Sequence, residues 1–240
     1  MTYCVGLLLK AGLVMLSDTR TNAGLDNIST YRKMFTFEQP GERVIAMMTA
    51  GNLSVTQTTL ARLGEAINDP DATHETSIMK AESMLDVATL VGDMLSRVTV
   101  ETKTRMDRMN QMASASMIVA GQRKGGRMRL FLIYPEGNFI EATEDTPYLQ
   151  IGEHKYGKPI LDRVITSDTP MEEARKAVLL SMDSTLRSNL SVGMPLDMVV
   201  IERDALRLSE QRRIEANDED FSAMSAAWSQ ALRDAFARIG

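Results

Sequence analysis

The sequence predicts an α+β fold in which two antiparallel sheets lie face to face and helices cover each outer face, an αββα sandwich. Segments typical of strands and segments typical of helices follow one another in blocks, and the chain opens with two apolar hairpins. Such blocks, rather than strict alternation, favour antiparallel sheets with helices segregated to their outer faces. The 240 residues suffice for one sandwich of this size, so we expect a single domain over 1–240.

Two hairpins form the beginning of the chain. An apolar run at 2–9 and its antiparallel partner at 13–18 are joined by a turn at 10–12. After a polar stretch, alternating residues at 32–37 and a mostly apolar run at 43–50 predict the second hairpin.

The remaining segments supply the helices and the other strands. Asn52 or Ser54 can cap a first helix, which Asp69-Pro70 ends. Apolar residues at helical spacing predict a long second helix. In chain order, the expected helices are 52–68, 81–112, 155–165, 171–187 and 219–238, and the further strands are 116–121, 127–134, 138–142, 148–151, 196–202 and 206–212.

Composition excludes several classes of partner. The formal net charge is -5, so no basic excess is present for binding nucleic acid or anionic lipid. No apolar run reaches the roughly 20 residues of a membrane helix, and the first ten residues lack the features of a secretory signal. Cys4 is the only cysteine, which rules out an intrachain disulfide and favours a reducing, cytoplasmic location. We expect no nucleic acid and no membrane partner.

Several chemistries have no support in the sequence. The two histidines, His74 and His154, do not have the spacing of a zinc site, and neither lies near a serine nucleophile motif. Neither GxxxxGK[ST] nor GxGxxG is present, so nucleotide binding has no motif. We therefore expect no metal and no cofactor.

Thr2 is the candidate nucleophile. Its small side chain permits removal of Met1, which would expose an amine and a hydroxyl on one residue at the start of a buried strand. A hydroxyl needs a base at neutral pH, and a free α-amine, with a reference pKa of about 8, can serve when it is neutral.

Asp18 and Lys33 are the candidate supporting pair. A neighbouring cation disfavours protonation of the amine, and Lys33 lies on a strand close in sequence to the first hairpin. A buried lysine needs an anionic partner, for which Asp18 at the end of the second strand is the natural candidate.

Gly51 is the candidate oxyanion donor, because Thr49-Ala50-Gly51-Asn52 ends a strand and opens a helix. Unpaired N–H groups at a helix N-terminus point toward incoming negative charge, and a glycine lets a substrate carbonyl approach the main chain.

Taken in order, these residues resemble the proteasome β-subunits. The stretch DTRTNAG at 18–24 is similar to the D-[ST]-R-x-[TS]-x-G segment of that family, with Asn22 in place of Thr or Ser. A leading Thr, an Asp, a Lys and then A-G before a helix form the ordered signature of the family. TYCVGLLLKAGLVMLSDTRTNAG and IGEHKYGKPILDR resemble the bacterial branch called Anbu, the ancestral β-subunit, and the resemblance covers essentially the whole chain.

The resemblance implies an N-terminal-nucleophile hydrolase with an αββα sandwich. It implies that Thr2 is the nucleophile, that Asp18 and Lys33 support it, and that Gly51 donates to the oxyanion. Family members assemble into rings or ring-like arrays, which implies a homo-oligomer acting on peptide substrates. The candidate substrate-binding residues are Thr21, Asn22, Thr49 and Leu53.

The chain departs from the family pattern at two places. Gly152-Glu153-His154 stands where the family usually has Gly-Ser-Gly, and Ser188 stands for the aspartate of D-x-x-S-G-G, in which Ser191 matches. Glu153, Ser188 and Ser191 are thus the candidate supporting residues. A carboxylate near the amine would raise the amine's pKa.

Other features have simpler interpretations. Cys4 shares a strand face with Thr2, but a mid-strand cysteine is usually inert core, and His154 has the setting of an exposed loop histidine. Met106, Met109 and Met112 recur at helical spacing and fit core or a subunit interface equally well. The basic residues Arg123, Lys124 and Arg127 are typical of a solvated turn.

Three functions remain open. The first is a threonine peptidase compartmentalised by its own oligomerisation, with an unknown ATPase partner left undecided. The second is a non-catalytic assembly protein on the same fold, which the departures at Glu153 and Ser188 favour. The third is a small-amide acylase, which differs from the first only in its substrate.

Overall fold

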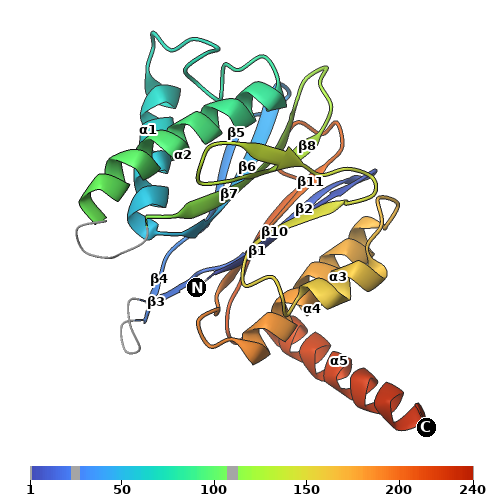
Figure 1. Cartoon of the computed structure of the whole chain (residues 1–240). Helices are drawn as coiled ribbons and strands as arrows, with labels where there is room; N and C mark the ends of the chain where they lie inside the picture. The colour runs from blue at the N-terminus through green and yellow to red at the C-terminus, as the bar shows by residue number, and fades with distance from the viewer. Residues whose placement is uncertain (1, 23–27, 107–112, 240) are drawn as a thin grey trace.

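A computed structural model of the protein describes residues 2–22, 28–106 and 113–239. Two sheets lie face to face, with helices α1 (Leu53–Asn68) and α2 (Met84–Met106) over one of them. Helices α3 (Lys158–Val164), α4 (Met171–Ser188) and α5 (Glu219–Arg238) lie on the side of the other (Figure 1). The predicted αββα sandwich is confirmed.

The first sheet contains the first two strands of the chain and its last three. Its strand order is β10-β1-β2-β11-β12, and all neighbouring pairs are antiparallel. The predicted first hairpin lies at its centre. Its strands are β1 (Tyr3–Leu9), β2 (Gly12–Asp18), β10 (Tyr148–Gly152), β11 (Leu196–Glu202) and β12 (Glu210–Ile214).

The second sheet is built from consecutive strands, in the order β5-β6-β7-β8-β9, and is also antiparallel. The predicted second hairpin forms the first two strands of this sheet. Its strands are β5 (Met34–Gln39), β6 (Arg43–Gly51), β7 (Ala115–Arg123), β8 (Arg129–Ile133) and β9 (Phe139–Glu141).

Side-chain alternation divides the buried residues into three layers. On β6, Ile45 and Met47 pack under α1 and α2, while Ala46 and Met48 face the other sheet. On β1, Val5 and Leu7 pack toward α4. Because successive residues of a strand point to opposite faces, each sheet is apolar on both faces, as the nearly unbroken apolar runs of the sequence require.

Local signals explain the helix boundaries. The Asn52 side chain caps α1 by accepting a hydrogen bond from Val55 N at 3.2 Å. The second helix begins at Met84 rather than at 81, because Ser83 accepts from Asp86 N and so takes the capping position. The end of the predicted range, 107–112, lies outside the described residues, as does the side chain of Met106. The predicted stripe of Met106, Met109 and Met112 therefore lies outside the described side chains.

Two expectations differ from the structure. The polar stretch after β2 contains a short antiparallel ribbon, β3 (Arg20–Asn22) with β4 (Ile28–Thr30), that the sequence did not predict. The strand expected at 206–212 begins at Glu210, because Asp204 and Leu206 have φ of 64° and 49° and turn the chain first. Among the described helices, none is long and apolar enough to cross a membrane.

Candidate active site

Thr2 lies immediately before β1 and is 9% exposed. Its carbonyl oxygen accepts a hydrogen bond from Glu153 N at 2.7 Å. Gly152, at the end of β10, has φ +81°, and a Cβ at that position would overlap the Thr2 carbonyl oxygen. A glycine is therefore required at 152 for β10 to approach the start of the chain this closely.

Asp18 and Lys33 form a buried ion pair, with Lys33 Nζ 2.7 Å from Asp18 Oδ1. Lys33 Nζ also donates to the Arg20 carbonyl oxygen at 2.6 Å. The Asp18 carboxylate accepts two further hydrogen bonds, from Tyr3 N at 3.1 Å and from Gly193 N at 3.2 Å. Burial raises the pKa of the Asp18 carboxyl, and Lys33 with these two N–H groups opposes that rise.

The same pair is tied to the start of β1. Tyr3, whose backbone N–H binds Asp18, directly follows Thr2. Thr2 and Lys33 also line one cavity of about 120 Å³. A cation held beside the residue whose amine would act as base is the arrangement that the sequence predicted. Of the four predicted substrate-binding residues, Thr21, Thr49 and Leu53 line the same cavity. The cavity is lined by Thr2, Thr21, Lys33, Thr49, Ala50, Gly51, Leu53 and Thr56.

Gly51 ends β6 at this cavity with φ +107°. A Cβ at 51 would overlap the backbone carbonyl oxygen of Ser114, the residue before β7. Both the backbone conformation and the close approach of the two chains therefore require glycine.

Gly51→Ala is expected to lower the free energy of unfolding by about 1–3 kcal/mol, from the strained φ alone, and by more through the overlap with Ser114. Chemical denaturation at fixed protein concentration measures the loss. Gly41→Ala is the matched control, because Gly41 has φ +79° and open space around the added methyl. Equal losses in the two variants would show that the approach to Ser114 contributes nothing.

Comparison with known proteins identifies the family. The family model described as Proteasome subunit matches residues 2–201. The chain belongs to the proteasome subunit family. A search among curated proteins found no match.

Among solved structures, Anbu (ancestral beta-subunit) from Yersinia bercovieri is 45% identical with TM-score 0.92, covering 99% of this chain and 97% of that one. An Anbu (Gly-1) mutant from Hyphomicrobium sp. strain MC1 is 50% identical with TM-score 0.91, covering 100% and 98%. The helical assembly of the Anbu complex from Pseudomonas aeruginosa is 47% identical with TM-score 0.93, covering 99% and 97%. The resemblance to Anbu within the proteasome family is confirmed.

The two positions that depart from the usual proteasome pattern, Glu153 and Ser188, are not part of the Asp18–Lys33 ion pair. Ser188 ends α4, and Ser191 lies in the following loop, where its N–H binds the Asn189 side chain. That loop reaches the site through Gly193, which donates to Asp18. Within the described part of the chain, no hydrogen bond joins the side chain of Ser188 or Ser191 to Thr2.

Glu153 reaches Thr2 through its backbone, as described above. Its side chain is 17% exposed and lies 3.6 Å from Lys155 Nζ. A lysine close to this carboxylate offsets part of its negative charge near the start of the chain. Asn22 ends β3, and its side chain lies outside the described part of the structure.

Sequence reasoning missed a buried polar network beside Thr2. The Tyr3 hydroxyl lies 2.6 Å from Ser181 Oγ on α4 and accepts a hydrogen bond from Gln150 Nε2 at 2.6 Å. Burial raises the pKa of the Tyr3 hydroxyl, so the hydroxyl remains protonated. The network fixes the start of β1 against α4. Nothing in the sequence signals it, since the three residues lie far apart in the chain.

Cys4 is fully buried between the sheets, and its thiol lies 3.8 Å from the Thr49 carbonyl oxygen. Burial raises the pKa of the thiol well above its ordinary range. A thiol held in its neutral form is a poor nucleophile, which agrees with the interpretation of Cys4 as core.

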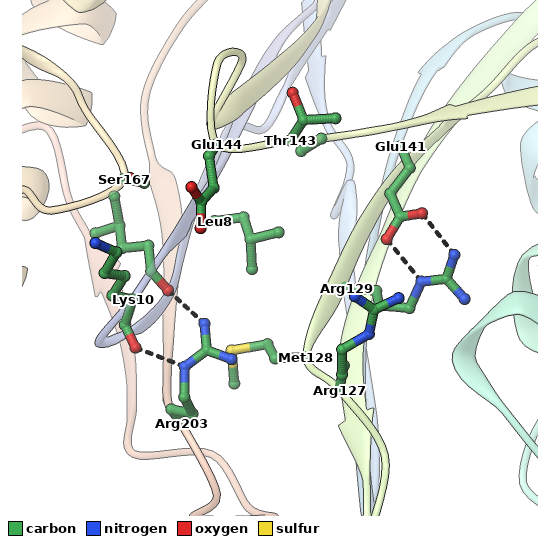
Figure 2. Close-up of a pocket in the computed structure, with 12 residues that line it drawn as sticks. Leu8, Lys10, Arg127, Met128, Arg129, Glu141, Thr143, Glu144, Ser167 and Arg203 are labelled. Atoms are coloured by element: carbon green, nitrogen blue, oxygen red, sulfur yellow. Dashed lines mark hydrogen bonds and ion pairs between the residues drawn. The ribbon is translucent and has the colours of Figure 1, made fainter.

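A separate cavity of about 380 Å³ lies at the opposite end of β1, and Figure 2 shows it. It is rich in cationic side chains, but most of these are already occupied. Arg203 donates to the carbonyl oxygens of Lys10 and Leu9, and Arg129 forms a two-point ion pair with Glu141 (Figure 2). Lys10 pairs with Asp168 at 2.7 Å. Since its charges serve the fold, this cavity is a weaker candidate for chemistry.

Proposed function

We propose that the protein is a threonine peptidase whose nucleophile is Thr2, exposed as the first residue after removal of Met1. One observation carries the proposal: Thr2, Lys33 and Gly51 line a single cavity, and Lys33 is held there by buried Asp18. An assembly protein would have no need of a buried cation beside the start of its first strand, since burial of a charge costs several kcal/mol unless the charge is paired.

The first half-reaction forms an ester. Thr2 Oγ attacks the peptide carbonyl carbon, and its proton passes to the Thr2 α-amine, directly or through one water. The positive charge of Lys33 favours the neutral amine that accepts this proton. The Gly51 N–H donates to the oxyanion of the tetrahedral intermediate, an interaction often worth about 3–4 kcal/mol. The C–N bond then breaks, and the leaving amine takes the proton from the α-ammonium.

The second half-reaction releases the acid. Water attacks the ester carbonyl, giving its proton to the α-amine, and a second tetrahedral intermediate forms at the same N–H donor. The C–O bond to Thr2 breaks, the hydroxyl regains a proton, and a carboxylic acid leaves. The two half-reactions together consume one water and require no oxidant, metal or cofactor.

The small cavity is the proposed site of the acyl-side residue. Thr49 of β6 and Thr56 of α1, both buried, line it together with Leu53, the first residue of α1. A volume of about 120 Å³ suits a small, uncharged side chain. Thr21 and Asn22, on the adjoining β3, are proposed to bind the substrate backbone.

The oligomer is the proposed compartment. The Pseudomonas aeruginosa relative is described as a helical assembly, and an assembly of this kind would restrict access to Thr2. We propose self-association of this chain, in the cytoplasm, with its single domain as the repeating unit. Nothing in the described residues indicates whether an ATPase binds to this assembly.

Intact mass before and after incubation with a β-lactone tests the function. The expected result is the mass of the chain without Met1, followed by one adduct located on Thr2 by peptide mapping. A retained Met1 with no adduct would contradict the proposal, because a Thr2 amide nitrogen cannot act as base.

The second candidate is a non-catalytic assembly protein. The departures at Glu153 and Ser188 favour it, since a carboxylate near the α-amine raises the amine's pKa. Under this alternative the chain assembles normally and takes no adduct. A small-amide acylase would take the adduct and cleave small amides in preference to peptides.

A further inference from the structure

A cavity of about 380 Å³ lies at one open edge of the sandwich, where residues from the outermost strands of the two sheets, β5 and β12, line it together. We call it the edge cavity. None of the described residues lines both it and the cavity that holds Thr2, so the two are separate. The lining of the edge cavity includes Arg32, Met34, Asp197, Val199, Gln211 and Arg213.

Strand register directs charged side chains of the edge cavity into the layer between the sheets. Asp197 pairs with Arg213, and Val199 pairs with Gln211. Directly opposite residues of antiparallel strands have their side chains on the same face. Val199 packs between the sheets with Met34, and Asp197 shares its face because alternate residues of a strand point the same way. The edge cavity therefore combines apolar walls with a carboxylate and a guanidinium group.

Asp197 is a buried carboxylate that lacks a hydrogen-bond donor. The residue is 9% exposed, and its Oδ2 has no hydrogen-bond partner within the described residues. The closest cation, Arg213 Nη1, lies 3.8 Å from Oδ1, which is beyond hydrogen-bond distance. Burial raises the pKa of the Asp197 carboxyl, while Arg213 and Arg32 oppose that rise. Since a buried polar group without a partner is costly, a ligand that donates to this carboxylate would bind favourably.

Arg32 is the complementary group on the other sheet. Its side chain is exposed, and among the described residues it forms neither an ion pair nor a hydrogen bond. The edge cavity thus offers an unpaired cation and a carboxylate without a donor. A lone anion would be repelled by Asp197, and a lone cation would be repelled by Arg32 and Arg213. A ligand that carries both charges close together avoids both repulsions.

We propose that the edge cavity binds a free α-amino acid with an apolar side chain, its ammonium group on Asp197 and its carboxylate on Arg32. One carbon separates the two charged groups of an α-amino acid, whereas the charged ends of a peptide lie farther apart. Gln211 can donate to the same carboxylate, and Met34 and Val199 provide an apolar wall for the side chain. This site goes beyond the proposed function and does not depend on it.

The edge cavity adjoins the buried ion pair through the main chain. Arg32 directly precedes Lys33. Asp197 pairs in register with Ser17, which directly precedes Asp18. A ligand that joins the two walls would therefore link the chain segments that carry the two members of the pair. Because such a ligand binds only the folded chain, Tm should rise with its concentration.

Calorimetric titration of the parent protein with L-leucine tests the site, with analogues that each lack one charge. N-acetyl-L-leucine retains the carboxylate and loses the ammonium group, and L-leucinamide retains the ammonium group and loses the carboxylate. We expect saturable binding of L-leucine, and binding of each analogue weaker by about tenfold or more, a factor that corresponds to about 1.4 kcal/mol. Glycine, which has no side chain to bury, should also bind more weakly than L-leucine.

Two substitutions locate the ligand. Arg32→Gln and Asp197→Asn are each expected to weaken L-leucine binding by about tenfold, since each removes one charge-assisted contact. Arg127→Gln is the matched control, because Arg127 is an exposed arginine that lines the cavity at the opposite end of β1, and it should leave the affinity unchanged. Circular dichroism checks the fold of each variant. The comparison of analogues on the parent protein needs none of the variants to fold.

Four outcomes would overturn the site. They are absence of saturable L-leucine binding, N-acetyl-L-leucine binding as tightly as L-leucine, L-leucinamide binding as tightly as L-leucine, and an affinity that folded Arg32→Gln and Asp197→Asn both leave unchanged. The second and third would show a site for an anion or a cation alone, and the fourth would place the ligand elsewhere.

These outcomes are independent of the proposed peptidase. Labelling of Thr2 by a β-lactone without L-leucine binding would support the peptidase and overturn the edge site. L-leucine binding that depends on Arg32 and Asp197, without labelling of Thr2, would support the edge site and overturn the peptidase.

Discussion

Thr2→Ala is expected to abolish both peptide hydrolysis and β-lactone labelling while leaving the fold and the assembly intact. The variant removes the only atom proposed to form a covalent bond with substrate, and alanine at the second position still permits removal of Met1. Loss of a nucleophile acting in concert with its base typically lowers kcat by several orders of magnitude. Hydrolysis of a quenched peptide and intact mass after labelling measure the two effects.

Thr2→Ser is the matched control for this prediction. Serine retains the hydroxyl and the free α-amine and loses one methyl group, so it should retain labelling and a measurable rate. Size-exclusion chromatography and circular dichroism check that both variants assemble and fold. Hydrolysis retained by Thr2→Ala at the rate of the parent would exclude Thr2 as nucleophile and with it the proposed mechanism.

The elements that the sequence predicted are those whose signals are local. The last helix was expected at 219–238 and occupies Glu219–Arg238, where the Asp218 side chain caps it by accepting from Phe221 N at 2.8 Å. The β11 boundaries were also predicted as observed, from an apolar run. Periodicity and capping residues can be found within one window of sequence, so these boundaries require no knowledge of the rest of the fold.

The candidate site was predictable only in part. Thr2, Asp18, Lys33 and Gly51 were found because they occur in a fixed order near the start of the chain, and the structure brings them together. Gly193, which donates to Asp18, and Ser181, which contacts Tyr3, lie more than a hundred residues away from their partners. Their roles depend on how β11 and α4 pack against β1 and β2, and a pattern in the sequence does not contain that information.

The cavity of about 400 Å³ lined by Gly51, Leu132 and Ile151 depends on packing in the same way. Gly51 ends β6, and Leu132 and Ile151 lie one residue before the ends of β8 and β10, so only the face-to-face packing of the two sheets brings these residues to one place. The short β3–β4 ribbon was missed for a related reason. Its residues are polar and lack the alternation of a half-buried strand, so no hydrophobic period indicates it.

The buried Asp18–Lys33 pair is expected to stabilise the fold and to be required for activity. Lys33→Met would leave the Asp18 carboxylate buried with only the N–H groups of Tyr3 and Gly193, and we expect a loss of about 3–5 kcal/mol in the free energy of unfolding. Hydrolysis should fall sharply as well, because no cation would then favour the neutral Thr2 amine. Chemical denaturation and kcat/KM measure the two losses.

The loss of stability should depend on pH. Burial already raises the pKa of Asp18, and removal of Lys33 removes a group that opposes the rise. A carboxyl whose pKa is higher in the folded state than in the unfolded state destabilises the fold as pH rises above its ordinary value of about 3.9. The difference between Lys33→Met and the parent should therefore be larger at neutral pH than in acid.

The double variant Asp18→Asn with Lys33→Met separates stability from catalysis. Removing both charges leaves no unpaired buried ion, so we expect the double variant to be more stable than Lys33→Met alone, a coupling that a double-mutant cycle measures. Hydrolysis should remain lost in both, because the cation beside Thr2 is absent from both. Recovery of hydrolysis in the double variant would show that Lys33 serves only to neutralise Asp18, and the role of Lys33 in setting the protonation state of the Thr2 amine would have to be abandoned.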